Sequence, residues 1–124
     1  MTPDQFRRLA LSLPDTSEAR HMGHPDFRVH GKIFATLGYP DGSHAMIRLS
    51  PEDQGFLVRT QPEVYQPVKG AWGQAGCTNV RLRAARIGPV REALTFAWEA
   101  ASARPQRGGK RKAKARRPER REAP

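Results

Sequence analysis

Apolar residues recur along this chain with helical spacing in three places. Between residues 3 and 12 they return every three or four positions, after a capping sequence that starts at Thr2 and before Pro14, which ends the run. Ser50 caps the start of a second such segment, and Gly88 and the proline after it open a third. The pattern therefore predicts an N-terminal helix, a central helix and a C-terminal helix.

Alternation of apolar and polar residues predicts strands between these helices. It runs over 26–30, 33–37, 43–49 and 78–82, and 18–22 is a candidate first strand. The strands are grouped and do not alternate one for one with helices, which argues against a doubly wound parallel sheet. We expect the α+β class, with an antiparallel sheet of about five strands and helices packed on one face. The side chains expected to face inward are Phe27, Val29, Ile33, Ala35, Leu37, Ala45, Ile47, Leu49, Val80 and Leu82.

The positive charge of the chain is concentrated at its C-terminal end. The sequence has 22 Lys and Arg against 12 Asp and Glu, and residues 104–124 hold ten of the former and two of the latter. That segment therefore carries +8 of the formal net charge of +10, and residues 1–103 carry +2. From residue 104 on there is no aromatic residue and no aliphatic residue larger than Ala. We expect one folded domain over 1–103 and a disordered Lys/Arg-rich tail over 104–124.

Composition also indicates the cellular compartment of the protein. Cys77 is the only cysteine, which excludes an intrachain disulfide and a cysteine-based zinc site and fits a reducing cytoplasm. The longest apolar run has three residues, far fewer than the ~20 that cross a bilayer. The N-terminus has no basic stretch followed by an apolar run, so no secretory signal is expected. We expect a cytoplasmic protein without a membrane partner.

Motifs that would support catalysis are missing from the sequence. It contains no P-loop, no Gly-x-Gly-x-x-Gly after a strand, no Gly-x-Ser-x-Gly and no His-Glu-x-x-His. The spacing of Gly70, Gly73 and Gly76 does not match a dinucleotide-binding loop, so we interpret the segment as a mobile loop around Trp72. Cys77 has no base near it in the sequence and is interpreted as a small buried residue.

The histidines offer one candidate metal site. His21 and His24 lie close to Asp26 in the sequence, but metal ligands must converge at about 2 Å, and the sequence does not show that they do. Hydrogen-bonded structural or surface histidines are the simpler interpretation. We therefore expect no metal, no cofactor and no enzymatic activity.

Two motifs resemble a known family. Residues 23–34, with the sequence GHPDFRVHGKIF, resemble the G-H-P-x-F-x-V-x-G-K-x-F signature of the MmcQ/YjbR family. Trp72 with residues 73–80 is similar to its W-G-x-x-G-x-T-x-V segment, and residues 94–98 are similar to its final helix. The resemblance covers roughly 4–103, and the basic tail is an addition to the family pattern. It implies a frataxin/CyaY-like α+β sandwich and a DNA-binding role.

The expected outward face of the sheet is basic. Four arginines share it with the ring of Phe34 and with Met46, if the alternation holds. Guanidinium groups beside an exposed ring suit phosphate pairing and base stacking, whereas the simpler alternative is a solvated sheet face. Lys32, at a hairpin, either contacts phosphate or keeps the turn soluble. The candidate nucleic-acid contacts are Arg28, Lys32, Phe34, Arg48, Lys69, Arg81 and Arg83 in the domain and Lys110, Arg111, Lys112, Lys114, Arg116 and Arg117 in the tail.

These features together predict a DNA-binding protein with little sequence preference. The ten cations of the tail attract any polyanion through counterion release and supply the phosphate contacts. No helix-turn-helix is evident, and binding to single-stranded DNA or to RNA stays open. The alternative is a protein-interaction module that docks a partner on the Phe34/Met46 face or at the Trp72 loop. A small-molecule or metal-dependent enzyme ranks last.

Overall fold

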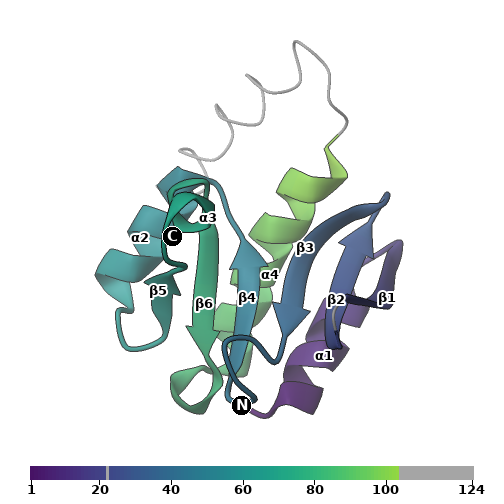
Figure 1. The fold of residues 1–124 in the computed structure, drawn as a ribbon, viewed down its shortest axis with the longest axis horizontal. Helices are drawn as coiled ribbons and strands as arrows, with labels where there is room; N and C mark the ends of the chain where they lie inside the picture. The colour runs from purple at the N-terminus through teal and green to yellow at the C-terminus, as the bar shows by residue number, and fades with distance from the viewer. Residues whose placement is uncertain (22, 104–124) are drawn as a thin grey trace.

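The computed structural model describes residues 1–21 and 23–103, so the expected tail over 104–124 lies outside the described residues. Within these residues, four α-helices, six strands and one 3₁₀ turn follow one another (Figure 1). No helix in this part of the chain is long and apolar enough to cross a membrane. The elements are α1 (Pro3–Leu11), β1 (Thr16–His21), β2 (His24–Val29), β3 (Lys32–Leu37), β4 (His44–Arg48), α2 (Pro51–Thr60), β5 (Tyr65–Pro67), α3 (Ala71–Gln74), β6 (Cys77–Arg81), η1 (Leu82–Ala84) and α4 (Ile87–Ser102).

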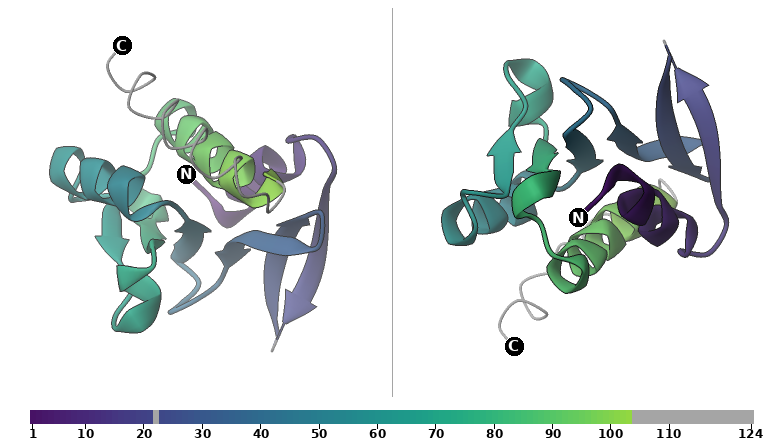
Figure 2. Two further views of the ribbon diagram at one scale, coloured as in Figure 1. Left: turned by 90° about the horizontal axis from the view of Figure 1, so that it is seen from above. Right: turned by 90° about the horizontal axis from the view of Figure 1, so that it is seen from below.

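The strands form one antiparallel sheet in the order β1-β2-β3-β4-β6-β5. The helices α1 and α4 contact each other and lie behind the sheet in Figure 1, against β3 and β4, whereas α2 lies beside β5 at one edge. The short helix α3 lies on the opposite side of the sheet from α1 and α4 (Figure 2). The predicted α+β class with an antiparallel sheet is confirmed. The sheet gains a sixth strand because the three-residue β5, which ends in Pro67, is too short to show alternation.

The first two helices begin at the predicted capping residues. Thr2 Oγ1 accepts a hydrogen bond from the Gln5 amide at 3.1 Å, and Gln5 Oε1 accepts one from the Thr2 amide at 2.9 Å. At the start of α2, Ser50 Oγ accepts a hydrogen bond from the Asp53 amide at 3.0 Å. Each cap provides a partner for an amide that the helix itself leaves without one, so these short sequences define where the helices begin.

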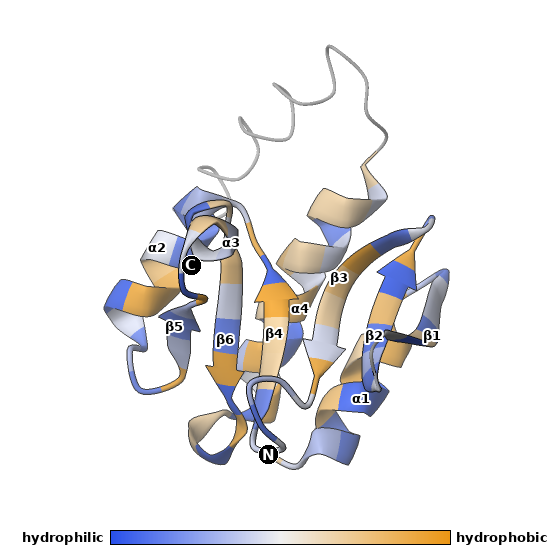
Figure 3. Cartoon of the chain, viewed as in Figure 1, coloured by the Kyte–Doolittle hydropathy of each residue, from blue (hydrophilic) through white to orange (hydrophobic). Residues whose placement is uncertain are grey.

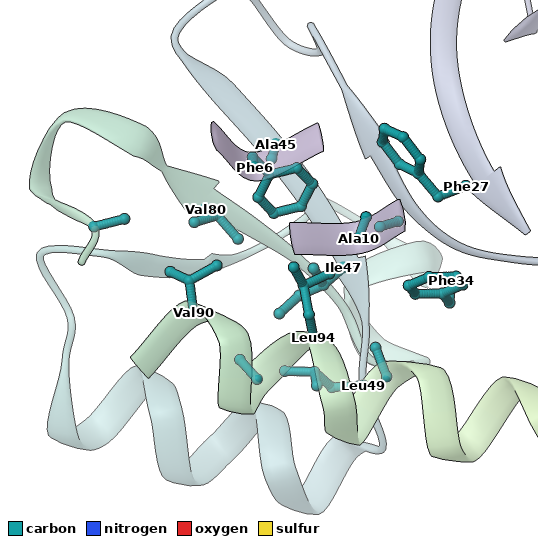
Figure 4. Close-up of a cluster of buried hydrophobic side chains, with 14 of the residues drawn as sticks. Phe6, Ala10, Phe27, Phe34, Ala45, Ile47, Leu49, Val80, Val90 and Leu94 are labelled. Atoms are coloured by element: carbon teal, nitrogen blue, oxygen red, sulfur yellow. The ribbon is translucent and has the colours of Figure 1, made fainter. Parts of the chain in front are cut away.

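The core lies between the sheet and the helices α1 and α4. Phe6 of α1 meets Phe27 of β2 edge to face, with the ring centroids 6.3 Å apart. Leu94 of α4 and Ile47 of β4 are fully buried in the same cluster (Figure 4). Hydrophobic and hydrophilic residues alternate along β2 and β6 (Figure 3), so each of these strands contributes one side to the core.

The predicted orientation of Phe34 is wrong, and that of Ile33 is wrong with it. Phe34 is fully buried among the core side chains (Figure 4). In the register of β2 with β3, Phe27 pairs with Ala35. The next residue of β2, Arg28, pairs with Ile33, so Phe34 is the extra residue of a β-bulge. The bulge interrupts the alternation, turns Phe34 to the helices and leaves Ile33 half-buried on the face of Arg28.

The segment expected to be a mobile loop around Trp72 is instead the short helix α3 in a closely packed turn. A Cβ atom on Gly73 would lie 1.6 Å from the backbone oxygen of Val68. A Cβ atom on Gly76 would lie 1.8 Å from the backbone oxygen of Leu49. Only glycine permits such close approaches of one backbone to another. Gly73 and Gly76, two of the three regularly spaced glycines, therefore allow the turn to pack closely against neighbouring backbone.

Candidate nucleic-acid interface

The face of the sheet opposite α1 and α4 is called the open face below. The register places Thr36, Met46 and Asn79 in one row across β3, β4 and β6. Two of the strands that cross this row end in exposed cations: Arg48 ends β4 and Arg81 ends β6. Since β4 and β6 are antiparallel, these two arginines mark opposite ends of the open face.

At one end, two arginines border an open depression of about 510 Å³. Arg81 lies directly opposite His44 of β4, and Arg83 follows in η1. Both arginines are exposed, and among the described residues neither forms an ion pair. Two such guanidinium groups beside an imidazole suit an anionic group such as a phosphate. The depression is lined by Ser43, His44, Arg81, Arg83 and Ala84.

The loop before β4 orients His44 at this end. Asp41 Oδ1 accepts hydrogen bonds from the Ser43 hydroxyl at 2.6 Å and the Ser43 amide at 2.9 Å, and it lies 2.9 Å from His44 Nδ1. These bonds, chiefly that from the Ser43 hydroxyl, hold the pKa of the Asp41 carboxyl well below its usual range. An ionised Asp41 requires the proton on Nδ1 in this contact. Sequence reasoning did not select Asp41 or Ser43, although the sequence Tyr-Pro-Asp-Gly over 39–42 is typical of a turn and could have pointed to their loop.

At the other end, Arg48 lies directly opposite Cys77. The prediction that Cys77 is a small buried residue is confirmed. Burial raises the pKa of its thiol, and the charge and hydrogen bond of the neighbouring Arg48 guanidinium oppose that rise. The helix α3, which contains Trp72, ends shortly before Cys77 and therefore lies at this end of the open face, on the side of the sheet away from α4 (Figure 2).

Lys69, in the turn before α3, lies at the same end of the open face as Arg48. The amide of Val68 donates a hydrogen bond to the carbonyl of Cys77 at 3.0 Å, which places the exposed Lys69 next to this end of β6. Trp72 is 67% exposed. Trp72 was not among the nucleic-acid contacts predicted from the sequence, although its large ring in a glycine-rich segment was a signal that could have selected it.

The remaining predicted contacts of the domain do not join either end. Arg28 forms a bidentate pair with the buried Asp26, with Nε–Oδ1 and Nη2–Oδ2 distances of 2.8 and 3.1 Å. The hydrogen bond to Asp26 raises the pKa of Arg28, and the pair is structural. Lys32 is exposed beside the β2–β3 turn, and Phe34 is buried. The six predicted tail contacts lie outside the described residues.

His24 and Asp26, two of the residues considered as metal ligands, have other neighbours. Asp26 is held by Arg28, and the His24 ring lies edge to face with Tyr39 at a centroid distance of 6.0 Å. Within residues 1–21 and 23–103, no three His, Cys, Asp or Glu side chains gather as metal ligands would.

Comparison with known proteins identifies both the fold and the family. The crystal structure of Deinococcus radiodurans protein DR2400, with the domain DUF419, has the same fold, with a TM-score of 0.71 and 15% sequence identity. The match covers 90% of this chain and 87% of that chain. No curated protein matches the chain. The YjbR family model matches residues 11–100, which span both ends of the open face. The chain therefore belongs to the YjbR family.

Proposed function

We propose that this chain binds nucleic acid through its phosphate groups, with little dependence on base sequence. The observation that carries the proposal is the exposed pair Arg81 and Arg83 beside His44. The sequence adds ten Lys and Arg in residues 104–124. Each phosphate that these cations neutralise releases counterions, which favours binding to a polyanion of any sequence.

The distribution of charge over the domain supports the same ligand. From Val64 to Val90 the sequence contains four basic residues and no acidic residue. This segment includes α3, β6 and η1, which are the elements that carry Trp72, Arg81 and Arg83. A surface of one sign attracts and orients a ligand of the opposite sign. In this proposal the chain binds its ligand in the cytoplasm without transforming it.

The salt dependence of binding tests the proposal. With a short DNA duplex of mixed sequence, the full chain is expected to show a slope of log K against log salt of about −4 to −6, since each neutralised phosphate contributes about −0.9. The double variant Arg81→Ala/Arg83→Ala is expected to make that slope shallower by about 2. Replacing the ten tail cations by Gln is expected to flatten it further.

The matched control is Arg59→Ala/Arg91→Ala, which removes the same charge from exposed positions on α2 and α4. A clearly larger effect of the first pair supports a site at Arg81 and Arg83. Equal effects of the two pairs would show that net charge alone governs binding. If the full chain binds no nucleic acid at low salt, the proposal fails, and a protein partner on the open face or at Trp72 becomes the better explanation.

A further inference from the structure

We infer that Trp72 is a stacking platform for an unpaired nucleobase, so that the chain binds single-stranded nucleic acid in preference to duplex. This inference rests on the proposed nucleic-acid binding and adds the type of strand. Trp72 is 67% exposed, more than Tyr39 at 59% or Phe56 at 38%. An exposed aromatic side chain at the same end of the open face as exposed cations suits stacking on a base whose phosphates are neutralised nearby.

The backbone of the turn that carries Trp72 is closely packed and hydrogen-bonded, although Trp72 itself is exposed to solvent. The glycine after it packs against the backbone of Val68, and Gly76 packs against that of Leu49. The buried side chain of Gln54 donates a hydrogen bond to the carbonyl of Gly73 at 2.9 Å. Because the backbone is fixed before any ligand arrives, stacking on this ring costs little ordering entropy.

Trp72 lies at the same end of the open face as two cations that can contact the phosphates of a stacked nucleotide. Lys69 lies before α3, and Arg48 is opposite the residue that starts β6. From that residue to Arg81 the strand spans about 13 Å at ~3.3 Å per residue. A short single strand that stacks one base on Trp72 can therefore reach the cations at both ends of the open face.

The geometry of stacking distinguishes single strands from duplexes. Inside a duplex each base is covered on both faces by its neighbours, so a protein ring reaches a face only by unstacking a base step. An unpaired base offers its face without that cost. Stacking also accepts every base, because each has a flat π-face, which agrees with binding that is independent of sequence.

Binding of the full chain to labelled oligo-dT and to a duplex of equal length tests the inference. For Trp72→Ala, single-strand affinity is expected to fall roughly tenfold, as loss of one stacked base predicts, while duplex affinity changes less than about twofold. Trp72→Phe keeps a ring and is expected to retain most of the single-strand affinity. The matched control Phe56→Ala removes an exposed ring from α2 and is expected to change neither affinity.

Intrinsic fluorescence provides an independent measurement, because Trp72 and Trp98 are the only tryptophans of the sequence. Trp98 is half-buried and donates from Nε1 to the Pro14 carbonyl at 2.9 Å. Stacking on Trp72 should quench emission of the wild type on addition of oligo-dT, and the remaining emission of Trp72→Phe should not change.

The outcomes separate the two proposals. Equal losses on single strand and duplex in Trp72→Ala, or no loss on either, would overturn the stacking inference and leave phosphate binding intact. Failure of the wild type to bind either nucleic acid would overturn both.

Discussion

Gln54 of α2 donates a hydrogen bond from Nε2 to the carbonyl oxygen of Gly73 at 2.9 Å, across 19 positions of the sequence. The same amide lies 3.0 Å from the carbonyl oxygen of Cys77 and 3.2 Å from Thr78 Oγ1, and all three contacts are buried. One side chain thus connects the helix at the edge of the sheet to the turn that presents Trp72 and to the start of β6.

Replacing Gln54 by Ala should therefore destabilise the domain and loosen α3. Buried acceptors lose a donor, which costs about 1–3 kcal/mol of unfolding free energy. Urea unfolding measures that loss, and lower fluorescence anisotropy of Trp72 would report the loosened turn. The control Gln66→Ala removes an exposed side chain with one local hydrogen bond, to Pro62, and should cost less than about 0.5 kcal/mol. Equal unfolding midpoints for the two variants would contradict the connecting role of Gln54.

A methyl group at Gly73 should be far more disruptive than one at Gly88. The Cβ of Gly73→Ala would overlap the Val68 carbonyl, so backbone must move, at a cost of at least about 2 kcal/mol. Gly88 lies in the first turn of α4 with nothing within 4 Å of a built Cβ, so Gly88→Ala should be neutral or stabilising by up to about 1 kcal/mol. Thermal unfolding of both variants checks the contrast, and a tolerated Gly73→Ala would rule out the close packing of this turn.

Phe34→Ala should act on stability and leave the strand preference unchanged. Truncating a fully buried phenylalanine costs about 3–5 kcal/mol, whereas truncating the partly exposed Phe56 should cost about 1 kcal/mol or less. Chemical unfolding measures both. At temperatures where Phe34→Ala remains folded, its ratio of single-strand to duplex affinity should equal that of the wild type. A selective loss of single-strand binding would instead indicate that the ring is accessible.

Tyr65 should make stability fall at high pH. Its side chain is fully buried, and its hydroxyl has no hydrogen-bond partner within the described part of the chain. Burial, assisted by the charge of Glu92, raises the pKa of Tyr65 to about 12. The unfolded chain releases this proton at a lower pH than the folded chain, so stability is present below pH ~10 and is lost as pH rises toward ~12.

Tyr65→Phe isolates this effect, because phenylalanine cannot ionise. Near neutral pH the variant should equal or exceed the wild type in stability, since the lost hydroxyl leaves no donor or acceptor unsatisfied. Between pH 10 and 12 the variant should become progressively more stable relative to the wild type, by up to about 2–3 kcal/mol. Urea unfolding at several pH values gives the difference, and a difference that does not change with pH would exclude a raised pKa.

Much of the fold follows from local sequence because its determinants are local. The caps at Thr2 and Ser50 satisfy amides within three residues, so the helix starts could be predicted from neighbouring residues alone. Alternation in 43–49 and 78–82 likewise placed β4 and β6 and the side chains that face the core. The common face of Arg48 and Arg81 followed from the same alternation.

Two of the errors concern relationships between segments, which the pattern within one segment does not show. The inward turn of Phe34 depends on the register of β3 against β2, which no spacing within β3 reveals. The rigid turn around Trp72 depends on the backbone of Leu49, more than 20 positions earlier. The pairing of Arg28 with Asp26, in contrast, could have been predicted from the sequence, because residues two apart in a strand share a face and Asp26 carries the opposite charge.

The β-bulge in β3 makes the chain sensitive to changes in length. Deleting one residue between Lys32 and Ala35 would remove the bulge and restore regular alternation, and the position that turns the Phe34 ring to the helices would be lost. An inserted residue is better accommodated at the turn around Gly31, where a Cβ atom would meet nothing within 4 Å. The number of residues in segment 23–34, as well as their identity, therefore decides which face of the sheet each side chain occupies.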